Sequence, residues 1–237
     1  VSFATYQDFI YNERGWLERQ GSPLFTQELR YQLPTAGATA QYNGNISEQH
    51  WAHGSLSTSP YFTYSYDKMD RMLSGVSIGG GMSEQLQYDR VGNIGQLIRD
   101  GHTTAYSYTQ GRLQEVWGTI SGVYSYDASG NALIDRTGFT YTYNHLNLPS
   151  TASKPGVSIS YSYDALGNKR KSIGASGAGI TRDYLPGGIE YTNGSLDRIS
   201  TSAGYITFSG STPVYQYYLS DHLGNVRTVF SASGGTA

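Results

Sequence analysis

A short pattern recurs along this chain and constrains its fold more than any other feature. It reads aromatic, any residue, Tyr, Asp or Asn, two further residues, Gly, and then Asn or Arg. The clearest copies occupy residues 64–67, 86–93, 124–131 and 161–168, with weaker ones at 9–15, 106–111 and 141–147. Successive copies lie about 20 residues apart, which is the length of one β-hairpin with its connection. The spacing therefore predicts an array of hairpins.

The polar half of the pattern has the residues of a tight turn. Asp or Asn at the first position accepts backbone amides two residues on, and Gly three positions later suits the last position. The turn residues of the clearest copies are Asp67, Asp89, Gly92, Asp127, Gly130, Asp164 and Gly167. Asp70 and Asn147 stand where other copies have Gly, and Thr109 to Gly111 is one residue short. We expect these three turns to differ from the rest.

The aromatic half of the pattern alternates with small hydroxyl residues, as in Tyr-Ser-Tyr and Tyr-Thr-Tyr. This period of two places both rings of a copy on one face of a sheet. A single hairpin cannot bury its own face, so its stability must come from its neighbours. The sequence predicts an all-β fold in which stacked copies form a tyrosine ladder. Its members are Tyr66, Tyr88, Tyr126 and Tyr163.

Composition supports this fold and excludes several kinds of partner. The chain has 30 Gly and 22 Tyr, as expected for many turns and many pleated strands. A net charge of -2 gives no electrostatic footprint for nucleic acid. Without cysteine, the chain has neither disulfides nor a thiol nucleophile. No apolar run is long enough to span a membrane as a helix.

The pattern also divides the chain. Residues 1–214 are interpreted as diverged repeats that are irregular at 21–60 and 172–213, and residues 215–237 as the start of a distinct motif. The irregular segments contain turn signals such as Asn43-Gly44 and Pro186-Gly187. No helical period is sustained, although residues 113–117 allow a short helical turn.

Tyr-x-Tyr-Asp-x-x-Gly-Asn at these intervals resembles the Rhs/YD repeat, diffusely over most of residues 6–170. Closer still, residues 217–227 resemble the motif that opens the Rhs repeat-associated core. The core motif residues are Asp221, His222, Leu223, Gly224 and Arg227. The resemblance implies hairpins that wind into a spiral sheet and form part of a hollow cocoon or shell. In toxin complexes of this family, the cocoon encloses a C-terminal toxin.

The resemblance implies a function as well as a fold. We expect a non-enzymatic structural shell segment of a secreted or bacterial cell-surface protein, which encloses or presents a cargo or toxin. Residues 42–46 and the form of the C-terminal motif look most like Bacteroidota members, which suggests type IX secretion. Expected partners are the remainder of the same polypeptide, an encapsulated toxin and secretion machinery. The alternative is a carbohydrate-binding or adhesion module that stacks glycans on exposed tyrosines.

Family toxins cleave themselves through an aspartyl-protease-like core after the Asp-His-Leu-Gly motif. This chain ends at Ala237, shortly after that motif. We therefore expect neither a protease module nor a toxin within it. We expect it to be the C-terminal part of a longer exported protein, whose open strand edges are covered by other parts of that protein, by a partner or by another copy.

Motifs that suggest other chemistry have simpler explanations. The Asp127 to Gly130 stretch looks like one aspartic-protease loop, but such a site needs a second loop to share a proton. One carboxylate per turn is too few for calcium. His50 and His53 lack a third metal ligand nearby. The family role of His222 is structural, as a turn side chain packed against the preceding strand. Glycines 79–81 lack the context of a phosphate loop. We predict no catalytic residue, no metal and no cofactor.

Overall fold

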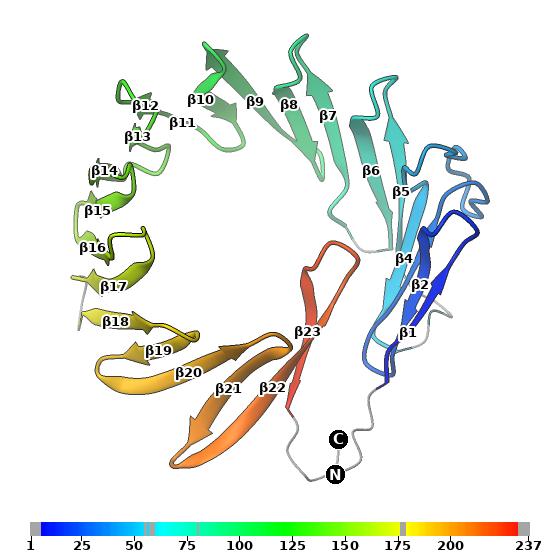
Figure 1. Cartoon of the computed structure of the whole chain (residues 1–237). Helices are drawn as coiled ribbons and strands as arrows, with labels where there is room; N and C mark the ends of the chain where they lie inside the picture. The colour runs from blue at the N-terminus through cyan, green and yellow to red at the C-terminus, as the bar shows by residue number, and fades with distance from the viewer. Residues whose placement is uncertain (1–5, 55, 57–59, 80, 176–178, 232–237) are drawn as a thin grey trace. The chain divides into compact units, whose positions relative to one another are not determined.

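The computed structural model describes residues 6–54, 56, 60–79, 81–175 and 179–231. Every regular element in these residues is a β-strand, and within each of two sheets every strand is hydrogen-bonded to its neighbours in the sequence. Figure 1 shows this succession of antiparallel hairpins, strand by strand, from β1 to β23. No described element is a helix with the length and hydropathy to cross a membrane.

The strands form two sheets in chain order. The first sheet comprises β1 (Asp8–Tyr11), β2 (Leu17–Gly21), β3 (Thr26–Arg30), β4 (Glu48–Ala52), β5 (Tyr61–Tyr66), β6 (Met72–Ile78), β7 (Glu84–Tyr88), β8 (Ile94–Arg99), β9 (His102–Thr109), β10 (Arg112–Gly118) and β11 (Gly122–Val123). The second comprises β12 (Ser125–Tyr126), β13 (Ala132–Ile134), β14 (Thr140–Tyr143), β15 (Pro149–Lys154), β16 (Val157–Tyr163), β17 (Lys169–Gly174), β18 (Ile180–Leu185), β19 (Ile189–Thr192), β20 (Ser195–Thr201), β21 (Gly204–Ser209), β22 (Thr212–Ser220) and β23 (Val226–Ser231).

The chain also divides into two compact units that do not coincide with these sheets. Unit 1 contains Val1–Ala105 together with Tyr218–Val229, and unit 2 contains Tyr106–Tyr217 together with Phe230–Ala237. The C-terminal motif therefore belongs to the same unit as the first hairpins. This grouping could not be anticipated from a repeat pattern that only relates neighbours along the chain.

Buried side chains concentrate in the stretch that lacks the repeat pattern. Phe25, Leu29 and Tyr31 are buried there, together with the polar side chains of Gln27 and Glu48. Most repeat residues are half-buried or exposed. Among the described residues of unit 1, buried side chains are thus most frequent between Gln20 and Glu48.

Two local expectations are wrong. Residues 113–117 lie in strand β10, because pairing with the neighbouring strands outweighs the helix propensity of so short a stretch. The turns with Asp70 and Asn147 in place of Gly keep the common geometry, with φ of 62° and 57°. Asp and Asn tolerate this left-handed conformation. The short turn does differ, since Gln110 and Gly111 both have positive φ, as in a two-residue hairpin loop.

Candidate functional site

The repeat turn is held by one side-chain oxygen, from Asp or Asn, that accepts hydrogen bonds from two backbone amides. In the copy that begins at Asp164, Oδ1 accepts the N–H groups of Leu166 and Asn168 at 3.0 and 2.9 Å. The amide of Gly167 donates to the carbonyl oxygen of Asp164 at 3.1 Å, and Gly167 has φ +83°. The same bonds recur at the turns that begin at Asp67, Asp89, Asp127, Asn144 and Asp221.

These bonds hold the turn carboxylates in the ionised form. The side-chain amide of Asn168 donates to Asp164, and with further backbone and Arg170 donors it outweighs the effect of burial. The pKa of Asp164 is thereby lowered to about 2. Asn93 and Asn131 lower the pKa of Asp89 and Asp127 in the same way. At Asp67, burial opposes the shift, but bonds from Arg71 still lower the pKa.

The second tyrosine of most copies ties its hairpin to the one before. The hydroxyl of Tyr88 donates to the carbonyl oxygen of Met72 at 2.7 Å, and that of Tyr163 donates to Pro149 at 2.9 Å. Each of these strands carries a β-bulge beside its tyrosine. The equivalent bonds elsewhere are Tyr66 to Ile46, Tyr126 to Leu113 and Tyr143 to Ala132. The predicted ladder residues are thus half-buried, with their hydroxyls bonded to a neighbouring hairpin.

The turns themselves also touch. In unit 1, the guanidinium of Arg71 lies 4.6 Å from the ring centroid of Tyr88, and its Nη1 donates to the carbonyl oxygen of Asp89 at 3.4 Å. In unit 2, the Asn131 amide donates to Oδ1 of Asn147 at 2.9 Å. The residue that follows one turn, Arg71 or Asn131, therefore lies beside the positive-φ residue of the next turn, Gly92 or Asn147. In each unit, such a contact joins two neighbouring turns of the repeat.

The C-terminal core motif is one more turn of this kind, with an added arginine. Asp221 accepts the N–H groups of Leu223 and Asn225, each at 2.9 Å, and Gly224 has φ +84°. Arg227 binds the buried Asp221 carboxylate with Nε and Nη2, both at 2.7 Å. Burial favours a higher pKa for Asp221, but the Asn225 and Arg227 bonds outweigh it and lower the pKa.

This motif contacts the first hairpins of unit 1. Nε2 of Gln27, on β3, lies 2.7 Å from Nδ1 of His222, and Nε2 of Gln20, on β2, donates to the carbonyl oxygen of Ser220 at 2.5 Å. Burial is the largest influence on His222 and lowers its pKa, so its imidazole is neutral at pH 7. His222 therefore contacts β3, whereas we expected it to pack against the strand before it.

Glu48 organises the irregular loop that precedes it. Its carboxylate is fully buried and accepts the N–H groups of Thr35 and Ala36 at 2.9 and 2.6 Å. Burial would raise its pKa, but these bonds and His50 outweigh it, so the pKa is lowered. Sequence reasoning missed Gln20, Gln27 and Glu48, because they lie outside the repeat pattern. The sequence did contain a signal for the arginine–aspartate pairs. Arg170 and Arg227 each lie six residues after the turn aspartate that they bind, Asp164 and Asp221.

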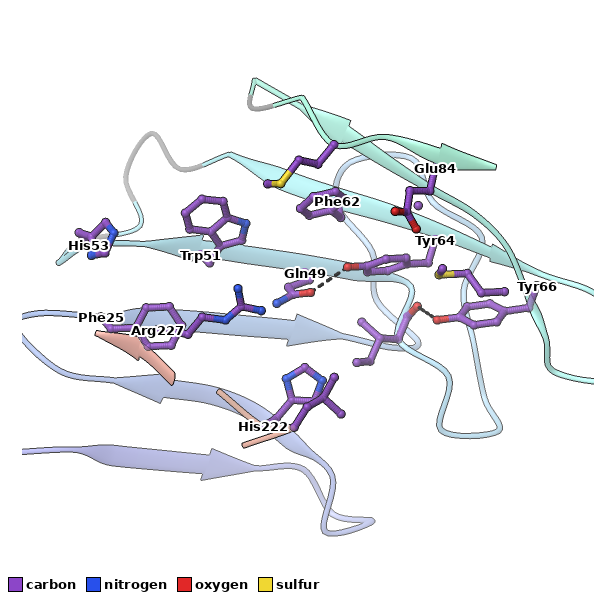
Figure 2. Close-up of a pocket in the computed structure, with 15 residues that line it drawn as sticks. Phe25, Gln49, Trp51, His53, Phe62, Tyr64, Tyr66, Glu84, His222 and Arg227 are labelled. Carbon is purple, nitrogen blue, oxygen red and sulfur yellow. Dashed lines mark hydrogen bonds between the residues drawn. The ribbon is translucent and has the colours of Figure 1, made fainter. Parts of the chain in front are cut away.

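A pocket of about 710 Å³ lies beside these contacts in unit 1. Figure 2 shows aromatic side chains along one side and the C-terminal segment on the other. The pocket is lined by Phe25, Ile46, Gln49, Trp51, His53, Phe62, Tyr64, Tyr66, Met72, Gly75, Met82, Glu84, His222, Leu223 and Arg227. Four of these are predicted residues, namely the repeat tyrosine Tyr66 and the core motif residues His222, Leu223 and Arg227, which lie more than 150 residues after it in the sequence.

The histidine and glycine motifs can also be located in the structure. Within the residues described, no group of three or more His, Asp or Glu side chains could hold a metal ion. His50 lies 3.4 Å from Glu48 and stacks on Tyr61, while His53 faces the carbonyl oxygen of Leu24. The 79–81 glycines include residue 80, which lies outside the described residues.

Comparison with known proteins agrees with this geometry. Two solved structures share the fold. They are a crystal structure of TcdB2-TccC3-TEV, with a TM-score of 0.63 and 12% identity, and the Tc holotoxin pore of Photorhabdus luminescens, with 0.61 and 11%. Each alignment covers 94% of this chain but only 15% and 14% of those chains. A search of curated proteins finds no matching relative.

The predicted all-β fold of YD hairpins is confirmed by these neighbours and by a family match over much of the chain. The matching family is described as the teneurin YD-shell, and the match extends over residues 38–181. That range includes the five turns between Asp67 and Asn168 and the tyrosine bonds described above, whereas the Asp221 turn lies beyond it. This chain therefore belongs to the teneurin YD-shell family.

Proposed function

We propose that this chain is a non-enzymatic segment of a protein shell that encloses or presents a polypeptide cargo, such as a toxin. One observation carries the proposal. The hydroxyls of the repeat tyrosines donate to backbone carbonyls of the preceding hairpin, as Tyr88 does to Met72 and Tyr163 to Pro149. The residues that recur in this sequence thus join one hairpin to the next, and a continuing array is what a shell wall requires.

The state of the turn carboxylates supports a structural role. A general acid needs a pKa near the working pH, and burial is the usual way to raise it. The pKa values of Asp89, Asp127 and Asp164 are instead lowered, because each carboxylate is hydrogen-bonded within its turn. Such groups are ionised and fully engaged at neutral pH. They are suited to fixing a backbone and not to transferring a proton.

The solved neighbours suggest which partners to expect. Their names describe a TcdB2-TccC3 assembly and a Tc holotoxin pore. Because this chain corresponds to a small part of those proteins, we propose that its partners are the remainder of its own polypeptide and an enclosed toxin. We propose that residues 1–214 supply repeats to this wall and that residues 215–237 begin the core motif, as the C-terminal part of the shell.

We also propose that the protein is secreted or displayed on a bacterial cell surface, and that it leaves a Bacteroidota cell by type IX secretion. The support is the resemblance of residues 42–46 and of the Asp221 to Arg227 motif to exported members of the Rhs group. Fractionation of the native host with an antibody to this chain tests the location. Recovery of the protein only from the cytoplasm would contradict it.

Protease protection tests the shell function. The complete polypeptide that carries this chain is purified and treated with a nonspecific protease in its native state. We expect a protected fragment from inside the shell, which becomes sensitive when Tyr88, Tyr126 and Tyr163 are all replaced by Ala. A Tyr161→Phe variant that is purified and digested in the same way is the control. Digestion of every fragment at the rate of the unfolded protein would overturn the proposal.

The structure does not favour the glycan alternative in its predicted form. Sugar binding by the ladder tyrosines needs free ring faces and hydroxyls. The hydroxyls of Tyr66, Tyr126 and Tyr163 are already donated to carbonyls, and the guanidinium of Arg112 lies over the Tyr126 ring. Saturable binding on a glycan array, abolished by replacing these tyrosines, would reverse this order of preference.

A further inference from the structure

The pocket in unit 1 has the size and lining of a binding site. Its volume of about 710 Å³ exceeds what one side chain fills and suits a ligand the size of a short peptide. Trp51 on β4 and Phe62 and Tyr64 on β5 present rings to it, and Phe25 adds a ring from the loop before β3. Rings arranged in this way favour an aromatic guest, since edge-to-face and offset contacts add to simple burial.

The hydroxyl groups on the pocket wall are already used. The hydroxyl of Tyr64 donates to Oε1 of Gln49 at 2.8 Å, and that of Tyr66 donates to the carbonyl oxygen of Ile46 at 2.9 Å. Figure 2 shows both bonds. Because the amide oxygen of Gln49 is occupied by Tyr64, the group that Gln49 can offer to a ligand is its N–H donor.

The C-terminal motif supplies further donors from the opposite side. Gln27 donates to Nδ1 of His222, so the neutral ring carries its proton on Nε2. Arg227 engages Asp221 through Nε and Nη2, which leaves the N–H groups of Nη1. The indole N–H of Trp51 adds another donor at the wall.

Charge on the wall is balanced. Arg227 is paired with Asp221, and Glu84 is paired with Arg99 through contacts of 2.5 and 2.6 Å. The remaining polar groups are mainly donors, with Glu84 as an acceptor. A ligand that matches them is uncharged and aromatic, and carries several carbonyl oxygens and some N–H groups.

We propose that this pocket binds a short stretch of polypeptide centred on an aromatic side chain, with its main-chain carbonyl oxygens facing Gln49, His222 and Arg227. The inference rests on the proposed function, because the segment that a shell would hold is part of its cargo. The aromatic ring packs among Trp51, Phe62 and Tyr64. The peptide backbone accepts hydrogen bonds from the C-terminal motif, which makes that motif part of the site.

Nuclear magnetic resonance of this chain tests the pocket directly. The probe is the capped tripeptide acetyl-Gly-Phe-Gly-amide, and the readout is the indole N–H signal of Trp51, identified with a Trp51→Leu variant. We expect a saturable shift of this signal, while those of Trp16 and Trp117 stay in place. Acetyl-Gly-Leu-Gly-amide should bind about tenfold more weakly, since it lacks the ring.

The chain offers a matched pair of variants for the donor side. Arg227→Gln removes the pocket guanidinium and its bond to Asp221, whereas Arg170→Gln removes the same kind of bond to Asp164 in unit 2. Arg227→Gln should weaken the Phe peptide about tenfold and Arg170→Gln should leave it unchanged. Unmoved Trp16 and Trp117 signals show that each variant is folded.

Several outcomes would overturn the inference. They are an unshifted Trp51 signal at saturating peptide, equal affinity for the Leu peptide, or equal effects of the two arginine variants. Tighter binding of acetyl-Gly-Phe with a free carboxylate than of the capped peptide would assign the pocket to chain ends or free aromatic acids instead. Protease protection of cargo without peptide binding would leave the shell function in place and remove only this site.

Discussion

The hydroxyl of Tyr163 on β16 donates a hydrogen bond of 2.9 Å to the carbonyl oxygen of Pro149 at the start of β15. Pro149 pairs with Tyr143 across a β-bulge in the preceding hairpin. One side-chain atom therefore links two consecutive repeats at the point where the strand pairing is irregular. Because this hydrogen bond joins two hairpins, it holds one repeat in register with the next, and an isolated hairpin cannot form it.

Tyr163→Phe tests this link. Removing only the hydroxyl should lower the free energy of unfolding by about 1 kcal/mol, because the Pro149 carbonyl loses its partner while the ring stays packed. Tyr161→Phe is the matched control, since the Tyr161 hydroxyl forms no hydrogen bond with the described residues, and it should change stability by less than about 0.5 kcal/mol. Urea denaturation of both variants measures the difference. Equal stabilities would show that the hydroxyl bond contributes nothing.

Gly167→Ala tests the left-handed turn position. At φ +83° an L side chain is strained, and its Cβ would lie 3.3 Å from Cδ1 of Leu148, so we expect a loss of about 1–2 kcal/mol. The control is Gly95→Ala in β8, where the added Cβ meets the Gln87 carbonyl oxygen at an ordinary 3.8 Å. That change should be neutral or slightly stabilising. A melting curve of Gly167→Ala that overlays the control would refute the turn geometry.

Asp164 predicts a specific acid sensitivity. Its pKa in the folded chain is about 2, below the ordinary value of 3.8, so the stability it contributes is present above pH 3.8 and is lost as the pH falls towards 2. Asp164→Asn should therefore be less stable than the natural chain at pH 6, and the two should converge near pH 2. Melting temperatures across this range give the test. Parallel curves would mean that the carboxylate is not protected in the folded state.

Gln27→Leu tests the contact between β3 and the C-terminal motif. The side chain of Gln27 is fully buried, and its loss leaves Nδ1 of His222 without its donor, so we expect a loss of about 1–3 kcal/mol. Gln87→Leu, at an exposed position of β7, should have little effect. Hydrogen exchange at residues 221–225 should rise in the first variant alone. Unchanged exchange there would show that the two segments are not coupled.

Sequence alone determined the hairpins, because their chemistry is local. An Asp carboxylate reaches amides two and four residues on, and Gly or Asn accepts a left-handed backbone whatever surrounds it. The turns at Asp89, Asp127 and Asp164 follow from these short distances along the chain. The same reasoning erred at Asp70 and Asn147, where the tolerance of these residues for positive φ was undervalued.

Only the tertiary structure decided what lies outside that local range. Gln27 and His222 are 195 residues apart, and no repeat period relates them. Their contact depends on how the hairpins of unit 1 pack against residues 218–229, which no pattern of neighbouring residues encodes. Glu48 likewise holds a loop with no period, through amides of Thr35 and Ala36 that only the folded loop brings to its carboxylate. The pocket forms where these long-range contacts meet, so its lining could not be predicted from the sequence.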